Sequence, residues 1–344
     1  MKSNSKIISA LSTLTLATLT ACGGGGGGAT PTASSGPVTN QPAFVLDTTI
    51  VTSVPAAAYS TGTEEKAAYN LLNSERGACG FGLLAQNTQL DAAARLHNDY
   101  QIINNTASHN QNQTQFPTGF TGARAFDRVT AAGYLDAAEV ADEFTFKSGT
   151  TSKTGIGEGG MRNLLSGPYH LAGMVDGYRD VGISVRSSAE TTPTGVNNRV
   201  ILHVNAAHKT AAAKQLIPTG EVRTYPCAGS VGVNRQLTNE TPNPVPGRDL
   251  AVNPIGTPIY VSTRVGDVLT IASASMKATG STTSIVLRQV VSENNDPNAK
   301  YRSHEAYFAP DAPLAPVTDY TVTVTGSANG VAFPPVSFKY TTGN

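Results

Sequence analysis

The spacing of apolar residues changes along this chain, and the change limits the folds that are open to it. From about Thr63 to Gly77, and again from about Thr88, apolar residues recur at helical spacing. After about residue 180 they alternate with polar residues, which is the pattern of half-buried strands. The sequence therefore predicts an α+β part, in which helices precede two strands at 180–186 and 199–206.

A second β-rich region follows a proline-rich stretch, residues 233–253, which we interpret as a linker. From residue 254 to 344 about six or seven short runs alternate apolar and polar residues, and an Asn329-Gly330 turn signal joins the last two. This pattern predicts an antiparallel, all-β sandwich. Its closing runs resemble the end of bacterial Ig-like modules, and no chemistry is visible in them.

The N-terminal residues predict export. Residues 1–22 combine two lysines with an apolar stretch that is too short to span a membrane. They end in Leu-Thr-Ala-Cys, which resembles the bacterial lipobox, so Cys22 is expected to carry lipid; a signal peptide cleaved elsewhere is the alternative. Six glycines and a Thr/Pro/Ser tract make residues 23–45 a flexible tether. Gly23, directly after the cysteine, resembles outer-membrane sorting, so we expect a lipid-anchored protein of the bacterial cell envelope.

The cysteine count follows from this anchor. If Cys22 carries lipid, two of the three thiols of the chain remain, Cys79 and Cys227. In an oxidising envelope compartment these two are expected to form a disulfide.

Charge and composition exclude nucleic acid as a partner. The 344 residues contain 24 Lys and Arg and 24 Asp and Glu, and the basic residues do not gather into a cluster. Binding to phosphates needs a concentrated positive field, which this chain lacks.

A histidine just after a Gly-Pro pair is the centre of the first part of the chain. Residues 166–175 place His170 there, after a predicted helix at 161–165. His109 follows an amphipathic helix, Glu139 follows Gly133, and a strand begins at residue 180. This order of parts resembles the CAP superfamily (cysteine-rich secretory proteins, antigen 5 and pathogenesis-related 1 proteins) in its bacterial form. The resemblance covers roughly residues 60–230 and implies an α-β-α sandwich, here a CAP domain at 46–232.

The resemblance also implies a cleft lined by histidines and acidic residues. We expect His109, Glu139 and His170 to meet there, with Glu143 as the rival of Glu139, because only the Glu of the family's Gly-Glu-Asn element is present. A second acidic residue has no clear counterpart, Glu158 being a weak candidate. His109 and His170 are candidate ligands of Zn²⁺ or another divalent cation.

Other histidines have simpler interpretations. His97 lies on the apolar face of its helix, which favours a packing role. His203 and His208 could reach a site from the edge of a strand, but surface or half-buried positions on the strand are favoured for both.

Three classes of function remain open. The CAP resemblance favours a binding module for an apolar or sterol-like ligand, or for an envelope component. The tether and the Ig-like region would also suit a structural or adhesion protein. A metal-dependent hydrolase is the third class, although the chain contains neither a Gly-x-Ser-x-Gly nor a His-Glu-x-x-His motif.

Overall fold

The computed structural model describes residues 48–192 and 195–344. The predicted signal peptide, Cys22 and the predicted tether lie outside these residues. Among the described helices, none combines the length and the apolar character that crossing a membrane requires.

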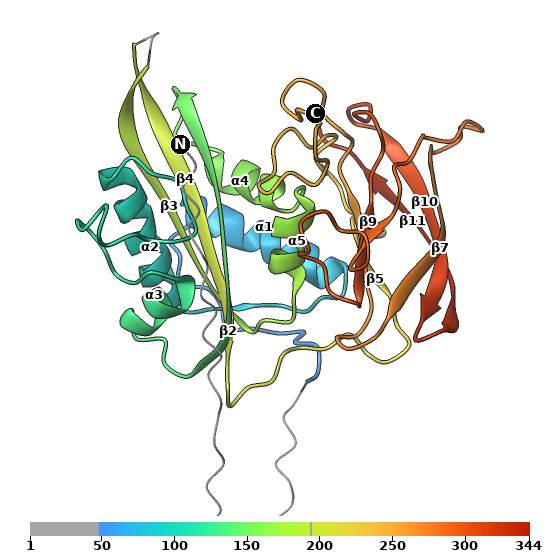
Figure 1. The fold of residues 1–344 in the computed structure, drawn as a ribbon, viewed down its shortest axis with the longest axis horizontal. Helices are drawn as coiled ribbons and strands as arrows, with labels where there is room; N and C mark the ends of the chain where they lie inside the picture. The colour runs from blue at the N-terminus through green and yellow to red at the C-terminus, as the bar shows by residue number, and fades with distance from the viewer. Residues whose placement is uncertain (1–47, 193–194) are drawn as a thin grey trace, which may run out of the picture. The chain divides into compact units, whose positions relative to one another are not determined.

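A four-stranded sheet organises the first part of the described chain (Figure 1). Its strand order is β1-β3-β4-β2, from β1 (Ala85–Gln86), β3 (Asp180–Thr192), β4 (Gly195–Lys209) and β2 (Ala137–Thr150). The short β1 pairs with β3 in parallel, and the remaining pairs are antiparallel. The strands predicted at 180–186 and 199–206 are therefore present, and both are longer than predicted.

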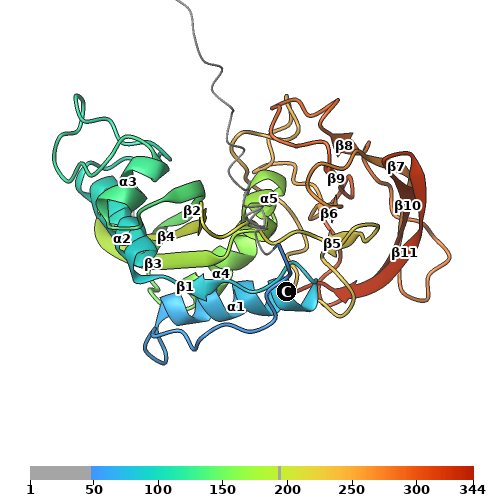
Figure 2. The same ribbon diagram turned by 90° about the horizontal axis from the view of Figure 1, so that it is seen from below.

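Helices cover both faces of this sheet (Figure 2). Helices α1 (Glu64–Ala78), α4 (Ile156–Leu164) and α5 (Pro168–Val175) pack on one face. Helices α2 (Thr88–Ile103) and α3 (Ala125–Ala131) pack on the other. Alternation along β4 produces the two faces, because Leu202 and Val204 join the core under α1 while His203 and Asn205 point toward α2. The structure thus has the layered α-β-α arrangement that the resemblance implied.

The start of the first two helices follows from local capping. The Thr63 side chain accepts a hydrogen bond from the Lys66 N–H, and two glutamates occupy the first turn of α1. The Asn87 side chain caps α2 by accepting from the N–H groups of Gln89 and Leu90. These local signals explain why the sequence located both helices well.

Two local features were not predicted from the sequence. The segment around Glu139 and Glu143 belongs to β2, which pairs along its length with β4. The helix predicted at 161–165 corresponds to α4, which begins earlier, and a further helix follows it: Gly167 is the N-cap of α5 and Pro168 its first residue. Proline suits that position because its missing N–H would have no partner within the helix. His170 therefore lies in the first turn of a helix.

Two antiparallel sheets make up the C-terminal part. One has the order β11-β10-β7 and the other β5-β6-β9-β8. The first consists of β7 (Leu269–Ala278), β10 (Asp319–Ala328) and β11 (Val331–Thr341); the second of β5 (Arg223–Tyr225), β6 (Ile259–Ser262), β8 (Val291–Ser292) and β9 (Glu305–Phe308). Apolar residues of both sheets form one core. Asn329 and Gly330, both with positive φ, form the two-residue turn between β10 and β11 that the sequence signalled.

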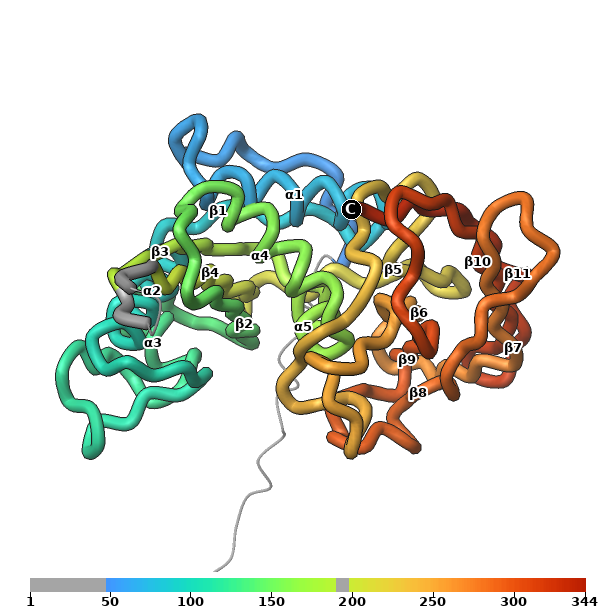
Figure 3. The backbone as a smooth tube through the Cα atoms, turned by 90° about the horizontal axis from the view of Figure 1, so that it is seen from above, coloured from blue at the N-terminus to red at the C-terminus, as the bar shows by residue number. Residues whose placement is uncertain are grey.

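The C-terminal part shares contacts with the first part. Tyr260 and Tyr301 belong to the same apolar core as α1, α4 and α5, and the Tyr301 hydroxyl donates a 2.9 Å hydrogen bond to the Pro168 carbonyl. The stretch predicted to be a linker packs a small core of its own, which includes Leu237 and Leu250. Figure 3 shows the chain of this stretch passing beside α5. The described residues form one compact unit.

The predicted disulfide between Cys79 and Cys227 is confirmed, with Cα atoms 5.4 Å apart. It joins the C-terminal end of α1 to the residues just after β5. Both cysteines are buried, so the bridge fastens the start of the first part to the start of the C-terminal part.

Candidate functional site

The structure brings His109 and His170 together. Their ring centroids lie 6.3 Å apart, and both side chains line the same cavity of about 380 Å³. His109 comes from the loop after α2 and His170 from the first turn of α5. The two histidines thus meet over β2, which is an edge strand of the sheet.

Glu240 holds His170 from the segment that was predicted to be a linker. Its Oε1 atom lies 2.9 Å from Nδ1 of His170 and also accepts a weaker bond, 3.4 Å, from the His170 backbone N–H. Only 2% of the Glu240 side chain is exposed. A Cβ atom on Gly167 would lie 1.7 Å from the other Glu240 oxygen, so glycine at this position makes room for the carboxylate. Glu240 also places its negative charge at the positive end of α5.

The carboxylates of Glu240 and Glu143 change the pKa of His170. Burial lowers the pKa of His170, but the hydrogen bond and charge of Glu240, together with the charge of Glu143, outweigh burial and raise it to about 9. At neutral pH the imidazole of the metal-free protein is therefore protonated and donates its Nδ1–H to Glu240.

Glu143 lies on the other side of His170. Its Oε2 atom is 3.7 Å from Nε2 of His170, and a Cβ atom on Gly173 would lie 2.4 Å from its Oε1. Burial raises the pKa of Glu143 to about 7, although His170 and His109 oppose the shift. Near neutral pH the protonated and the ionised forms of this carboxyl group are therefore both populated.

Asp142 precedes Glu143 on β2 and points to the opposite face of the sheet. Its Oδ2 lies 3.2 Å from Nδ1 of His109, and its Oδ1 lies 2.7 Å from both Nη2 of Arg128 and Nε2 of His203. Burial would raise the pKa of Asp142, but the charges of His203 and Arg128 and the bonds from both histidines hold it well below its usual value. Asp142 is thus a buried, ionised anchor for His109.

His109 responds to the same contacts. Burial lowers its pKa, but the hydrogen bond that His109 donates to Asp142 and the charges of Asp142 and Glu143 outweigh burial, so its pKa is raised. Because Asp142 and Glu240 occupy the two Nδ1 atoms, the Nε2 atoms of both rings are left for a ligand.

This arrangement can hold a divalent cation. One ligand atom from each of His109, Glu143 and His170 lies within 4.8 Å of the others. Two imidazoles and a carboxylate are common zinc ligands, and they leave a position open for a further ligand. Metal-binding histidines usually donate their other N–H to a carboxylate or carbonyl, as His109 and His170 can do here to Asp142 and Glu240.

A second cluster of similar composition does not suit a metal. His97, Asp142 and His203 also lie close together, but both nitrogens of His97 are engaged, with the Ser108 carbonyl at 2.9 Å and the Gln111 amide at 3.0 Å. Burial is the largest cause that lowers the pKa of His97 to about 3. His97 therefore holds the loop after α2 in place, in keeping with the packing role inferred from the sequence.

Glu139 does not join the two histidines. Its carboxylate pairs with Lys214 at 2.5 Å, and Glu143 takes the place beside His170. His208 is also elsewhere, since its Nδ1 bonds the Ala212 carbonyl at 2.9 Å. Asp142 and Glu240 were not among the predicted site residues.

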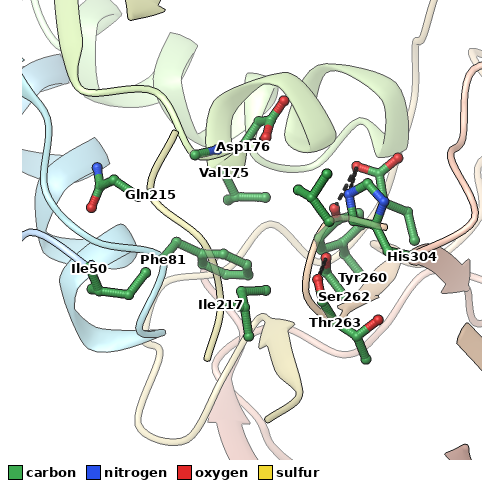
Figure 4. Close-up of a pocket in the computed structure, with 13 residues that line it drawn as sticks. Ile50, Phe81, Val175, Asp176, Gln215, Ile217, Tyr260, Ser262, Thr263 and His304 are labelled. Carbon is green, nitrogen blue, oxygen red and sulfur yellow. Dashed lines mark hydrogen bonds and ion pairs between the residues drawn. The ribbon is translucent and has the colours of Figure 1, made fainter. Parts of the chain in front are cut away.

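Another cavity, between the two parts of the described chain, is too small for an organic ligand. Figure 4 shows Phe81, Ile217 and Tyr260 among the side chains around it. Its volume is about 20 Å³, room for about one water molecule.

Residues 69–196 match the model of the cysteine-rich secretory protein family, CAP. The match supports the CAP superfamily for this part of the chain, and such a domain suggests a secreted or surface protein. Among solved structures, an outer surface protein of Borrelia burgdorferi is similar, with 12% sequence identity, a TM-score of 0.32, and coverage of 44% of this chain and 97% of that protein. The curated proteins contain no match to the chain.

Proposed function

We propose that this protein is a binding module of the bacterial cell envelope whose cleft holds a divalent cation, with zinc as the first candidate. The observation that carries the proposal is the convergence of His109, Glu143 and His170, with a buried carboxylate behind each imidazole. An open coordination position would then face the cavity and take an atom of the ligand.

We also propose that Cys22 is lipidated and anchors the protein, with the outer membrane as its location. The lipobox-like residues before Cys22 and the glycines after it support this proposal. The C-terminal part, as an Ig-like sandwich, would serve as a spacer or adhesion module. A Cys22→Ser variant should leave the membrane fraction; retention at the wild-type level would count against the anchor.

A metal-dependent hydrolase is the second candidate, and one observation favours it. Glu143, with its pKa raised to about 7, has the proton affinity of a general base at neutral pH. If Glu143 acts in that role, only the two histidines remain to bind the metal, so the binding module accounts for all three side chains more simply.

Zinc titration tests the proposal directly. By calorimetry near neutral pH, the full chain should bind one Zn²⁺, and a His109→Ala, His170→Ala double variant should not. Circular dichroism of the double variant establishes that its fold is retained. Equal zinc binding by both proteins would refute the cation site.

Mass spectrometry of the purified protein addresses the apolar or sterol-like ligand. A lipid that stays bound through purification would indicate that the cleft also binds an apolar ligand. If no lipid is found, the proposal of a cation site is unaffected.

A further inference from the structure

Two large cavities are lined by the residues on either side of His109. The first, of about 560 Å³, lies in the loop after α2, and the second, of about 590 Å³, lies between that loop, β2 and the segment around Glu240. Ser108 and Asn110 line both, and we call the two neighbouring cavities the groove. His109 and His170 line its second half, which connects the groove to the proposed cation site.

Side-chain amides dominate the lining of this groove. Nine different Asn and Gln residues contribute to it, together with several Ser and Thr hydroxyls. Among the described residues, no hydrogen bond engages the side-chain amides of Asn110, Gln113 and Gln236. An amide offers both donors and an acceptor, which matches a hydroxyl group, itself donor and acceptor.

The charges of the groove are few and paired. Its lining, as far as the described chain shows it, contains no Lys, Arg or Asp, and its one glutamate, Glu240, pairs with the protonated His170. In the metal-free protein, a charged ligand would lose its hydration here without meeting an unpaired opposite charge, which is costly. Without metal, the lining therefore favours neutral ligands.

Aromatic rings supply the remaining surface. Phe116 and Phe120 line the first cavity, and Phe144 and Phe146 line the second. Phe144 already packs edge-on against His109. Phe146 is 47% exposed, and the Arg199 guanidinium lies 5.2 Å from the centroid of its ring. Exposed aromatic rings with amide groups around them suit a ligand that has both apolar C–H faces and hydroxyl edges.

We propose that this groove binds a neutral oligosaccharide, laid past the histidines from one cavity to the other. The proposal names the ligand class for the cleft described under the proposed function and rests on it for the place of the site. Sugar rings present hydroxyl edges to amides and C–H faces to aromatic rings, and a chain of them fits a groove longer than a single cavity.

Calorimetric titration of the full chain with soluble oligosaccharides tests this inference. The probes are N-acetylglucosamine oligomers and glucose oligomers, each as a disaccharide, tetrasaccharide and hexasaccharide, and they distinguish an N-acetylated glycan from a plain glucan. Affinity for at least one series should increase with chain length. With a chelator present, a galacturonic acid oligomer, which is anionic, should bind more weakly than the neutral series.

Phe146→Ala is the informative variant, because about half of the ring is exposed; circular dichroism establishes that the fold survives the loss of its contact with Arg199. It should lower the affinity by roughly three- to tenfold, the range expected for the loss of one aromatic contact. Phe126→Ala is the matched control, since Phe126 is 44% exposed on α3 and lies outside both cavities. Its affinity should equal that of the wild type.

Three results would overturn the inference: no binding of any neutral oligosaccharide, equal binding by the Phe146→Ala variant and the wild type, or a preference for the anionic oligomer when a chelator is present. Each titration is repeated with zinc and with a chelator. Sugar binding without zinc binding would refute only the cation site, and zinc binding without sugar binding would refute only the oligosaccharide groove.

Discussion

Nδ1 of His170 lies 2.9 Å from Oε1 of Glu240, a residue seventy positions later in the chain. The family match ends at residue 196, so this carboxylate comes from outside the matched region. The cavity beside His170 is therefore lined both by the region that matches the family and by a segment that lies beyond it.

Replacing Glu240 with Gln should lower the pKa of His170 from about 9 toward its ordinary value. Burial lowers this pKa, and the Glu240 carboxylate is the largest of the causes that raise it. The variant should also bind zinc about 10–100-fold more weakly, as expected when a carboxylate behind a metal-binding histidine is lost. NMR titration of the imidazole and calorimetry measure the two effects. An unchanged His170 pKa would contradict the assignment.

The same contact makes stability depend on pH in the metal-free protein. The pKa of His170 is raised in the folded state, so its stabilising contribution is complete below the unfolded value of about 6.5. This contribution disappears as the pH rises through about 9. Denaturant unfolding of the wild type should show a fall across this window that is smaller in Glu240→Gln. Parallel curves for the two proteins would contradict the prediction.

Zinc affinity should increase with pH across the neutral range. Zinc competes with the protons on Glu143, whose pKa is raised to about 7, and on His170, whose pKa is raised to about 9. Calorimetry between about pH 6 and 8 should therefore give steadily tighter binding with proton release. Affinity that does not vary with pH would exclude these two groups as ligands.

Glu143 and Glu139 form a matched pair for testing which carboxylate belongs to the site. Glu143→Gln should weaken zinc binding by more than about tenfold, because it removes a candidate ligand. Glu139→Gln removes a partly exposed ion pair with Lys214 and should leave the affinity within about twofold of the wild type. A larger loss of zinc affinity in Glu139→Gln than in Glu143→Gln would indicate that Glu139 is the ligand.

Reduction of the Cys79–Cys227 disulfide should destabilise the fold by roughly 2–5 kcal/mol, since the bridge closes a long loop. Denaturant unfolding with and without a reductant measures the difference, and a Cys79→Ala, Cys227→Ala variant serves as the control that no longer responds to the reductant. An equal midpoint for the oxidised and reduced wild type would be inconsistent with this role.

The sequence predicted the parts of the fold that depend on local signals. Helices α1 and α2 carry their own caps, and the Asn329-Gly330 turn needs only its own backbone preference. By contrast, β2 contains Ala and Glu residues that also suit a helix, and it is a strand because it pairs with β4 far along the chain.

The candidate site was predicted only in part, because some of its contacts join residues that are far apart in the sequence. His109 and His170 were found through the resemblance, but Glu240 lies among prolines and asparagines that resemble a linker. Its burial depends on His170, a contact that no local pattern reveals. Asp142 is a similar case, because Arg128 and His203 compensate its buried charge from two other elements.

The Cys79–Cys227 bridge also determines how a mechanical pull would travel through the protein. Tension applied between the two ends of the chain passes through the covalent bridge and bypasses residues 80–226, including both histidines of the cleft. Glu240 lies beyond the bridge, on the stretch that carries the load. A sustained pull would therefore load the segment that carries Glu240 and leave the loop that carries His170 unloaded, so the contact between these two residues joins a loaded and an unloaded part of the chain.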